Sequence, residues 1–250
     1  MTLQIAAGKL AGALALTAAG LTVASLIGSL SAHLAPHANG LWREAQESFI
    51  RLFYLDSEAN IPTWFASSML LGCAALLGLI ALAKNREGDS FARHWSALAV
   101  IFLGLSLDEA ALLHEMAIKP LRPLFDSSGF LHYTWVVPGA LVVCLLAVAY
   151  LRFLLHLPWK TRILAAISGA LYVGGAIGAE AVTGKHAAQF GEGNLAYAML
   201  ATAEEVMEML GVVTFMYALL EYAGRELGEV TLSLGTTKRR SAPGATGAER

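Results

Sequence analysis

The chain has 250 residues, of which 56% are hydrophobic and only 14% are charged, and its mean hydropathy is +0.59. This composition excludes an ordinary soluble domain of the same length and indicates a polytopic membrane protein. The formal net charge of −2, without a basic face, gives no sign of a nucleic-acid partner, and the two cysteines show no metal or redox spacing.

Six apolar stretches are long enough to cross a bilayer as helices, at about residues 10–32, 62–83, 94–114, 134–156, 161–184 and 195–223. The sequence therefore predicts an all-α fold, a six-helix transmembrane bundle within one domain, residues 1–230. The first stretch ends in Leu30-Ser31-Ala32, which resembles a signal-peptide cleavage site. Because its apolar core is longer than that of a signal peptide, we expect it to be retained as a helix.

The connection between the first two stretches contains an amphipathic segment at residues 41–54. On a helix its apolar and charged side chains separate, with Trp42, Ala45, Phe49 and Phe53 on one side and Arg43, Glu47 and Arg51 on another. We expect this helix to lie flat in the outer membrane interface. Residues 231–250, rich in Ser, Thr, Gly and basic residues, predict a disordered cytoplasmic tail.

Lysine and arginine are unevenly distributed between the connections. If the N-terminus is inside, twelve of the 17 basic residues lie on the inner side and five on the outer side. The positive-inside rule then predicts a multi-pass protein of the cell (inner) membrane with both termini in the cytoplasm.

The most unusual stretch is residues 201–211, where Glu204, Glu205 and Glu208 interrupt an otherwise apolar span. On a helix the three carboxyl groups fall within roughly a 100° arc, and Glu204 and Glu208 are one turn apart. Ionised carboxylates this close repel strongly in a low dielectric, so they must share protons or hold a cation. Since no lysine or arginine lies in this span, the sequence predicts a functional polar site.

More acids lie toward the outer ends of the third and fifth stretches. Helical rise places Glu204 ~12 Å below the outer end of its span, and Asp108 ~10 Å below Glu115. On a continuous third helix, Asp108 and Glu115 project within ~20° of each other, His114 stands ~100° from Glu115, and Glu109 points away. Carboxylates of three helices are therefore expected at one level, in the outer half of the membrane.

These side chains form a candidate metal-binding set, which consists of Asp108, Glu109, His114, Glu115, Glu180, His186, Glu204, Glu205 and Glu208. Alternatives remain for its outer members, because Glu115 can meet lipid headgroups and Glu180 can pair with Lys185. His33, His37 and His132 lie near the same side. A loop position explains His33 and His37 better than a ligand role, and an interfacial belt explains His132 equally well. The small residues at 168–170 and 174–178 predict a helix-packing surface rather than a binding loop.

Carboxylates with a few imidazoles and no thiolate favour Fe, Mn or Zn as a divalent metal. Over fragments of three helices the pattern resembles the carboxylate-bridged di-iron and di-manganese helical bundles, in which two helices give Glu and two give Glu-x-x-His. This chain has Glu109-x4-His114 and no Glu-x-x-His, so the resemblance implies a metal class and assigns no ligands. The whole chain also resembles uncharacterised bacterial six-span membrane proteins with similar acidic segments.

Three functions fit these features. The first is a metal-dependent membrane enzyme, an oxidoreductase or a hydrolase, that acts on a lipid-like or quinone-like substrate at the outer leaflet. The second is a transporter or channel that conducts protons or cations through intramembrane carboxylates. The third is a structural subunit whose partner supplies arginines. Ser106, Asp108 and His114 share one span but cannot form a triad on a single helix.

Overall fold

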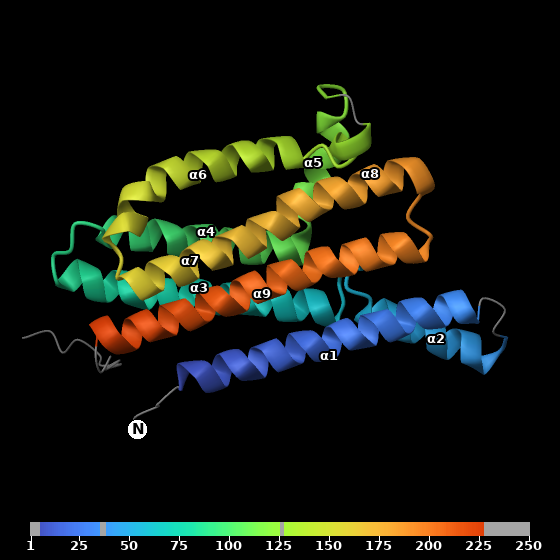
Figure 1. Cartoon of the computed structure of the whole chain (residues 1–250), viewed down its shortest axis with the longest axis horizontal. Helices are drawn as coiled ribbons and strands as arrows, with labels where there is room; N and C mark the ends of the chain where they lie inside the picture. Colours follow the sequence, from blue (N-terminus) through green and yellow to red (C-terminus); the bar gives the residue numbers. More distant parts are fainter. Residues whose placement is uncertain (1–5, 36–38, 126–127, 228–250) are drawn as a thin grey trace, which may run out of the picture.

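The structure is a computed structural model that describes residues 6–35, 39–125 and 128–227, and within these residues the chain is helical and contains no strand (Figure 1). The elements are α1 (Ala7–Leu34), α2 (Leu41–Phe53), α3 (Ile61–Arg86), α4 (Ala92–Ala111), α5 (Leu113–Leu121), η1 (Gly129–Leu131), α6 (Val136–His156), α7 (Trp159–Val173), η2 (Gly174–Ala179), α8 (Glu180–Phe190) and α9 (Leu195–Glu226). The all-α prediction is confirmed. The expected tail at 231–250, and also His37, lie outside the described residues.

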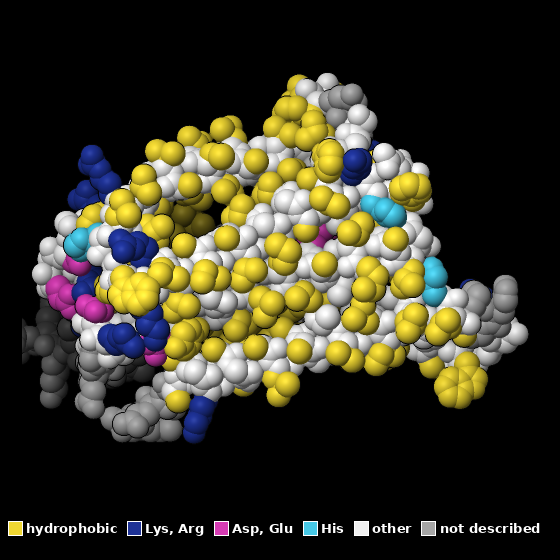
Figure 2. Space-filling model, viewed as in Figure 1, with side chains coloured by type: hydrophobic (Ala, Val, Ile, Leu, Met, Phe, Trp, Pro, Cys, Tyr) yellow, Lys and Arg dark blue, Asp and Glu magenta, His cyan; other side chains and the backbone are white. Residues whose placement is uncertain are grey.

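Five helical segments are long and apolar enough to cross a membrane: α1, α3, α6, the continuous segment Trp159–Phe190, and α9. The pair α4 and α5 makes a sixth if the two helices are counted as one span, although they are bent by 75°. The observed fold is therefore compatible with a multi-pass membrane protein. Apolar side chains are spread over the face shown in Figure 2, and most of the charged side chains visible there gather at one end.

The core lies where α9 passes between α1, α3 and α7. Leu70, Leu77 and Ile80 of α3 and Leu219 of α9 are almost completely buried there. Helices α3 and α4 are joined by a reciprocal pair of hydrogen bonds, in which Ser67 Oγ donates to the Ser106 carbonyl and Ser106 Oγ donates to the Ser67 carbonyl, both at 2.8 Å. Ser106 is thus engaged with α3 and takes no part in a triad.

The amphipathic segment is helical as expected, but its orientation differs from the prediction. Helix α2 packs antiparallel on α1: Gln46 donates to Ser31 Oγ, and the backbone N–H of Leu55 donates to the buried Ser25 Oγ. It therefore runs beside the end of α1 instead of lying flat across the ends of the bundle (Figure 1). The buried serine in α1 and the following turn fix this direction, and helical periodicity contains no information about either.

The third predicted span, 94–114, is not one straight helix. Helix α4 ends at Ala111, Leu112 adopts a left-handed conformation with φ of 57°, and α5 starts anew at Leu113. The break is stabilised by Asp108, whose Oδ1 accepts the backbone N–H of His114 at 2.8 Å. A side chain that caps the next helix makes a sharp turn without glycine possible. The predicted angles between Asp108, His114 and Glu115 are therefore wrong.

The fifth predicted span, 161–184, is longer than expected and continues to Phe190. Its small residues form the expected packing surface, with a π-helical turn, η2, against α9. A Cβ atom on Gly175 would lie 2.9 Å from the Glu204 carbonyl, and one on Gly211 would lie 2.8 Å from the Tyr172 nitrogen. Glycine is therefore required at both positions for α7 and η2 to approach α9 this closely.

Helix α6 stands apart from the rest of the bundle. Of its 21 residues only Val136 and Phe153 are buried. Exposed apolar side chains, among them Leu141, Leu145 and Val148, cover its outer surface. A hollow with apolar walls opens between α6 and α7 on the face shown in Figure 2.

Candidate functional site

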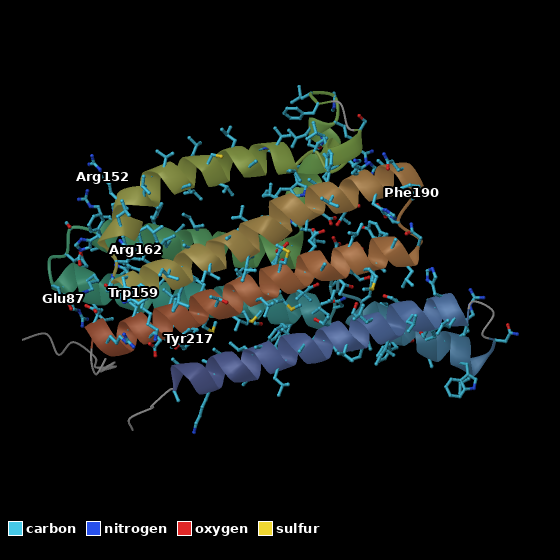
Figure 3. All side chains as sticks on the ribbon, viewed as in Figure 1. Glu87, Arg152, Trp159, Arg162, Phe190 and Tyr217 are labelled. Carbon is cyan, nitrogen blue, oxygen red and sulfur yellow. The ribbon has the colours of Figure 1, made fainter. Side chains whose placement is uncertain are left out.

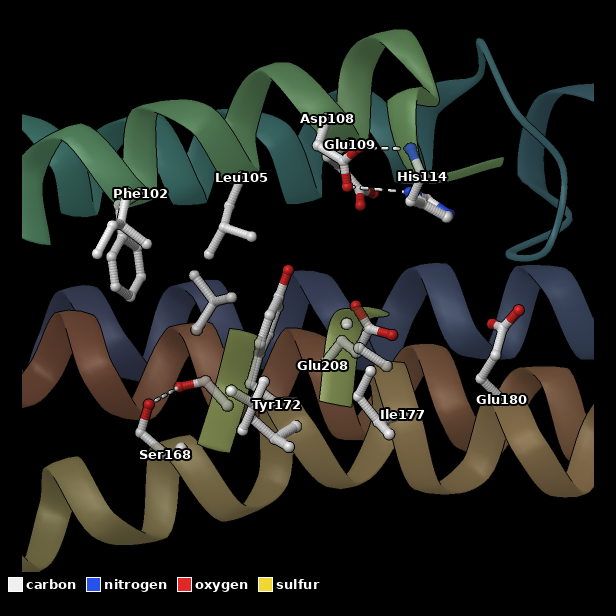
Figure 4. A pocket seen from close by; sticks show the side chains of 18 of the residues that line it. Phe102, Leu105, Asp108, Glu109, His114, Ser168, Tyr172, Ile177, Glu180 and Glu208 are labelled. Atoms are coloured by element: carbon white, nitrogen blue, oxygen red, sulfur yellow. Dashed lines mark hydrogen bonds and ion pairs between the residues drawn. The ribbon is translucent and has the colours of Figure 1, made fainter. Parts of the chain in front are cut away.

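A cavity of about 1210 Å³ lies between α4, α6, α7, η2 and α9. One end, bounded by Trp95, Phe153 and Leu157, is almost entirely apolar, and the other end is rich in carboxyl groups. Figure 4 shows Asp108, Glu109 and His114 pointing into this space from one side and Tyr172, Glu180 and Glu208 from the other. The volume exceeds the ~300–1,000 Å³ of pockets that hold drug-sized ligands. We call this cavity the acidic chamber.

Ten carboxyl-bearing residues line the acidic chamber: Asp56, Glu58, Asp108, Glu109, Glu115, Glu180, Glu192, Glu204, Glu205 and Glu208. No lysine or arginine is among the described residues that line it, and His114 is the one lining histidine there. Tertiary structure thus brings together the acids of α4, α5, α8 and α9, as the sequence predicts, and adds acids from two loops.

Asp108 and His114 form a close pair at the break between α4 and α5. Asp108 Oδ2 lies 2.9 Å from His114 Nδ1, while Oδ1 holds the backbone N–H of the same residue. This arrangement selects the tautomer in which Nδ1 carries the proton, and it leaves Nε2 unprotonated as a base or a ligand. The imidazole also packs against the Trp135 ring, with ring centroids 4.8 Å apart.

Glu180 and Glu204 face each other where η2 and α8 meet α9. The indole N–H of Trp135 donates to Glu180 Oε1 at 3.2 Å, which holds that carboxyl group toward the chamber (Figure 4). Glu204 is only 8% exposed. Lys185 is not the partner of Glu180, because its ammonium lies over the Phe130 ring, 4.5 Å from the centroid.

Most of the predicted site residues meet in the acidic chamber: Asp108, Glu109, His114, Glu115, Glu180, Glu204, Glu205 and Glu208. Glu109, expected to point away, lines it as well. His186 does not line it, since its Nε2 pairs with Asn194 Oδ1 at 2.9 Å near the start of α9. Its assignment to the candidate site is therefore wrong.

Two of the histidines with open roles have structural contacts. His33 Nε2 accepts the backbone N–H of Leu195 at 3.2 Å, which ties α1 to the start of α9. His132 packs its ring edge-on against Tyr133. Neither lines the acidic chamber.

Sequence reasoning missed several chamber residues. Tyr172 and Thr183 lie on the predicted span 161–184, where the sequence indicates only Glu180 as a candidate, and the sequence does not indicate Trp135. Helical spacing gave only a weak signal for them. The π-turn changes the register of the helix, so regular spacing does not place Tyr172, Ile177 and Glu180 on one side.

The described residues contain no group of three or more His, Cys, Asp or Glu side chains that could hold a metal ion. Asp108 already uses both carboxylate oxygens on His114. The remaining donors, Glu109, Glu204, Glu205 and Glu208, stand on opposite walls. The expected metal is therefore not matched by a preformed ligand set in this part of the chain.

Hydrogen-bonded tyrosines lie at the polar end of the acidic chamber. Tyr133 donates to Glu192 Oε1 at 3.0 Å, and its oxygen lies 3.2 Å from the Tyr197 hydroxyl. Asp56, in the loop before α3, keeps contact with water, but the surrounding protein removes part of its hydration and raises its pKa to about 7. The charges of Glu180 and Glu192 add to this rise, and hydrogen bonds from Tyr197 and Tyr54 oppose it.

Replacing Asp56 with asparagine should flatten the pH dependence of stability. Because the pKa of Asp56 is raised on folding, its contribution to stability is present below about pH 4 and is lost as the pH rises toward 7. The variant should therefore gain stability relative to the wild type at pH 8, by on the order of 1 kcal/mol since the carboxyl group stays in contact with water. Thermal unfolding at pH 5 and pH 8 measures the difference, and Glu44→Gln on the exposed face of α2 is the control. Equal pH profiles of Asp56→Asn and wild type would contradict the raised pKa.

A family model described as a domain of unknown function, DUF8692, matches residues 13–222. Comparisons with curated proteins and with solved structures find no significant match. The matched range contains all residues that line the acidic chamber. The chain therefore belongs to the DUF8692 family.

Proposed function

We propose that this chain is an integral membrane protein of six spans, with α4 and α5 together forming the third and both termini in the cytoplasm. The proposal is supported by the basic residues that gather where α3 meets α4 and where α6 meets α7 (Figure 3, Arg152 and Arg162). In this orientation the apolar end of the acidic chamber is near the cytoplasm, and its carboxyl groups lie toward the outer leaflet.

For a protein in this membrane orientation, we propose an enzyme that hydrolyses a lipid-like substrate by acid–base chemistry. The observation that carries the proposal is the Asp108–His114 pair at the polar end of a lipid-sized cavity. An imidazole oriented by a carboxylate is a general base, and carboxylic acids in an apolar wall are general acids. Polar groups at one end and an apolar space at the other match the two ends of an amphiphile.

In this hydrolysis, residues on the two sides of the acidic chamber have different roles. His114 Nε2 takes a proton from water while Asp108 stabilises the imidazolium that forms. The water oxygen bonds to the acyl carbon of an ester or amide, and the bond from that carbon to the alcohol or amine then breaks. A carboxylic acid on the facing wall, which Glu208 of α9 supplies, protonates the leaving group. Water acts as the nucleophile in this scheme, because Ser106 is bonded to α3 and Ser168 Oγ donates to the Gly211 carbonyl.

A divalent metal, Fe, Mn or Zn, is compatible with the same proposal. His114 Nε2 and the carboxylates of Glu109 and Glu208 would be its ligands, and Asp108 would orient His114. The metal would supply Lewis-acid activation of water or of a redox substrate such as a quinone.

Transport of protons or cations is the second candidate. A row of carboxyl groups that extends from Asp56 to Glu208 favours transport, since intramembrane acids form proton and cation pathways. Among the described residues, the far end of the chamber is lined by Trp95, Phe102 and Phe153 without Asp, Glu, His, Lys or Arg, so the row of acids does not continue there. A structural subunit is less well supported, since the acids face a cavity instead of an outer surface.

Hydrolysis can be tested without knowing the substrate. Purified protein is incubated in ¹⁸O-labelled water with vesicles made from a total membrane lipid extract, and lipid products are analysed by mass spectrometry. We expect one ¹⁸O atom in a released long-chain carboxylate with the wild type and none with His114→Gln. His186→Gln, at the histidine bonded to Asn194, should behave as wild type.

Two outcomes would change the assignment. Equal label incorporation with wild type and His114→Gln would remove His114 as the base, and no incorporation with either would contradict hydrolysis. Elemental analysis of the same preparations tests the metal. Stoichiometric Fe, Mn or Zn that is lost in Glu204→Gln/Glu208→Gln would support the metal, and active protein without metal would exclude it.

A further inference from the structure

The charge balance of the acidic chamber identifies what its occupant must carry. The carboxyl-bearing residues named above line it together with a single histidine, and no basic side chain of the described residues offsets them. His114 is already paired with Asp108. The other acids therefore lack a protein cation, and a ligand with positive charge and N–H donors would complement them.

A buried hydroxyl group indicates where the charged end of such a ligand would bind. Thr183 is 2% exposed and lines the chamber next to Glu204. Its hydroxyl faces the Glu204 carboxyl group, yet by distance and angle it makes no hydrogen bond to that group or to any other described residue. A buried hydroxyl without a partner is rare and costs free energy, so a ligand group at this point would gain from it.

Aromatic rings lie beside the same position. Trp135, which bonds Glu180 through its indole N–H, lines the chamber, and the Tyr133 ring packs against Gly184, the residue after Thr183. Faces of Trp and Tyr rings attract cations, most strongly when the cation is removed from water. Carboxylates together with aromatic faces distinguish an organic ammonium from a bare metal ion, which gains little from such rings.

The rest of the chamber fits an apolar chain. From the carboxyl groups the cavity continues between α4, α6 and α7, along Leu105, Leu146 and Ala166, to Phe153 and Leu157. The hollow between α6 and α7 opens toward the apolar outer face of the bundle (Figure 2). In the proposed membrane orientation a molecule could enter sideways from the lipid, with its polar end held at the level of Glu180.

Resting on the function proposed above, we infer that the substrate is a long-chain amphiphile with a protonated amine, bound with its ammonium between Glu180, Glu204 and Thr183 and its chain along α6. The ammonium donates N–H bonds to both carboxyl groups and to the Thr183 hydroxyl oxygen. Anionic headgroups such as phosphates and carboxylates are repelled at the same place. A neutral alcohol offers only one O–H donor, so it satisfies fewer of these acceptors.

Binding of a defined probe tests this inference. The full-length protein in phosphatidylcholine nanodiscs is titrated with a photoreactive sixteen-carbon primary amine, and then with the alcohol and the N-acetyl amide of the same chain. We expect the amine to bind at least about 30-fold more tightly than either neutral probe, because a buried charge pair is lost with them. Crosslinked peptides should map to α6 and to residues near Trp135.

Matched variants assign the headgroup position. Glu180→Gln/Glu204→Gln should remove the preference for the amine while crosslinking by the neutral probes is unchanged, since glutamine keeps the shape and the acceptor for Trp135. Thr183→Val should weaken the amine several-fold and leave the alcohol less affected. Glu44→Gln, exposed on α2, reports non-specific attraction of a cationic probe to an acidic protein.

The outcomes separate this inference from the proposed function. Equal affinity for amine and alcohol, with both probes crosslinked inside the chamber, would overturn the amine class and leave a lipid-binding enzyme in place. Crosslinking only on the outer surface would overturn the lipid-binding chamber itself, and with it the proposed function. An amine preference that Glu44→Gln reduces as much as Glu180→Gln/Glu204→Gln would also contradict the inference.

Discussion

Replacing Asp108 with asparagine should lower turnover in the ¹⁸O assay by about 10³–10⁴-fold, the loss typical of a base that is held in the wrong tautomer. Asparagine keeps an oxygen that can accept the His114 backbone N–H, so the break between α4 and α5 is preserved. Its NH₂ group, however, donates to Nδ1 and shifts the imidazole proton to Nε2. His114 then faces water with an N–H group and cannot accept a proton.

Three measurements separate a lost base from a lost fold. Thermal unfolding of Asp108→Asn should stay close to that of the wild type, while Asp108→Ala, which removes the cap as well, should be less stable by about 1 kcal/mol. The affinity of the amine probe should change little in Asp108→Asn, because the ammonium position lies at Glu180 and Glu204. Wild-type turnover in Asp108→Asn would exclude the Asp108–His114 pair from the chemistry.

Replacing Gly211 with alanine should destabilise the protein by about 1–3 kcal/mol, as overpacking of a close helix contact does. The new Cβ would lie 2.8 Å from the Tyr172 nitrogen and 3.1 Å from the Ser168 carbonyl oxygen, and backbone atoms cannot turn away. Helices α7 and α9 must separate, which lengthens the 2.8 Å bond from Ser168 Oγ to the Gly211 carbonyl. The wall that carries Glu208 then moves relative to Tyr172.

Gly169→Ala on α7 is the matched control, since nothing lies within 4 Å of a Cβ atom at that position. Alanine is a better helix former than glycine, so this variant should be as stable as the wild type or slightly more stable. Thermal unfolding compares the two, with a change in Tm of roughly 2–4 °C per kcal/mol expected for a chain of this size. Equal Tm values for both variants would contradict the close packing of α7 on α9.

Hydropathy was sufficient to predict where the long apolar helices lie, but not where they break. Apolar length alone places helices near all six predicted stretches, because a span needs a fixed number of apolar residues whatever packs beside it. The acids at Glu204, Glu205 and Glu208 were recognisable as a site for a similar reason. A carboxyl group in an apolar helix costs free energy wherever it points, so its presence indicates a function before its partners are known.

Two breaks in regular helix decided the geometry of the acidic chamber. Leu112 takes a left-handed conformation because Asp108 captures the His114 backbone, and this break turns His114 toward the chamber. The π-turn at Gly174–Ala179 sets the register that brings Glu180 opposite Glu204. Neither event has a signature in helical spacing, since both replace regular helix by an irregular turn. Local hydrogen bonds from Asp108 stabilise the first turn, and packing of η2 on α9 stabilises the second.

The predictions for His186 and for the orientation of α2 were wrong because they depend on contacts that local sequence patterns do not show. His186 lies on the same helix as Glu180, yet its hydrogen bond to Asn194 holds it outside the chamber, and sequence spacing does not reveal which neighbour a histidine will find. Helix α2 follows its predicted amphipathic pattern, but the hydrogen bond from Leu55 to Ser25 fixes its direction. The sequence by itself determined which segments are helical and which acids require a partner. Tertiary structure decided where these acids meet, because that depends on a few hydrogen bonds and glycine contacts between segments far apart in the chain.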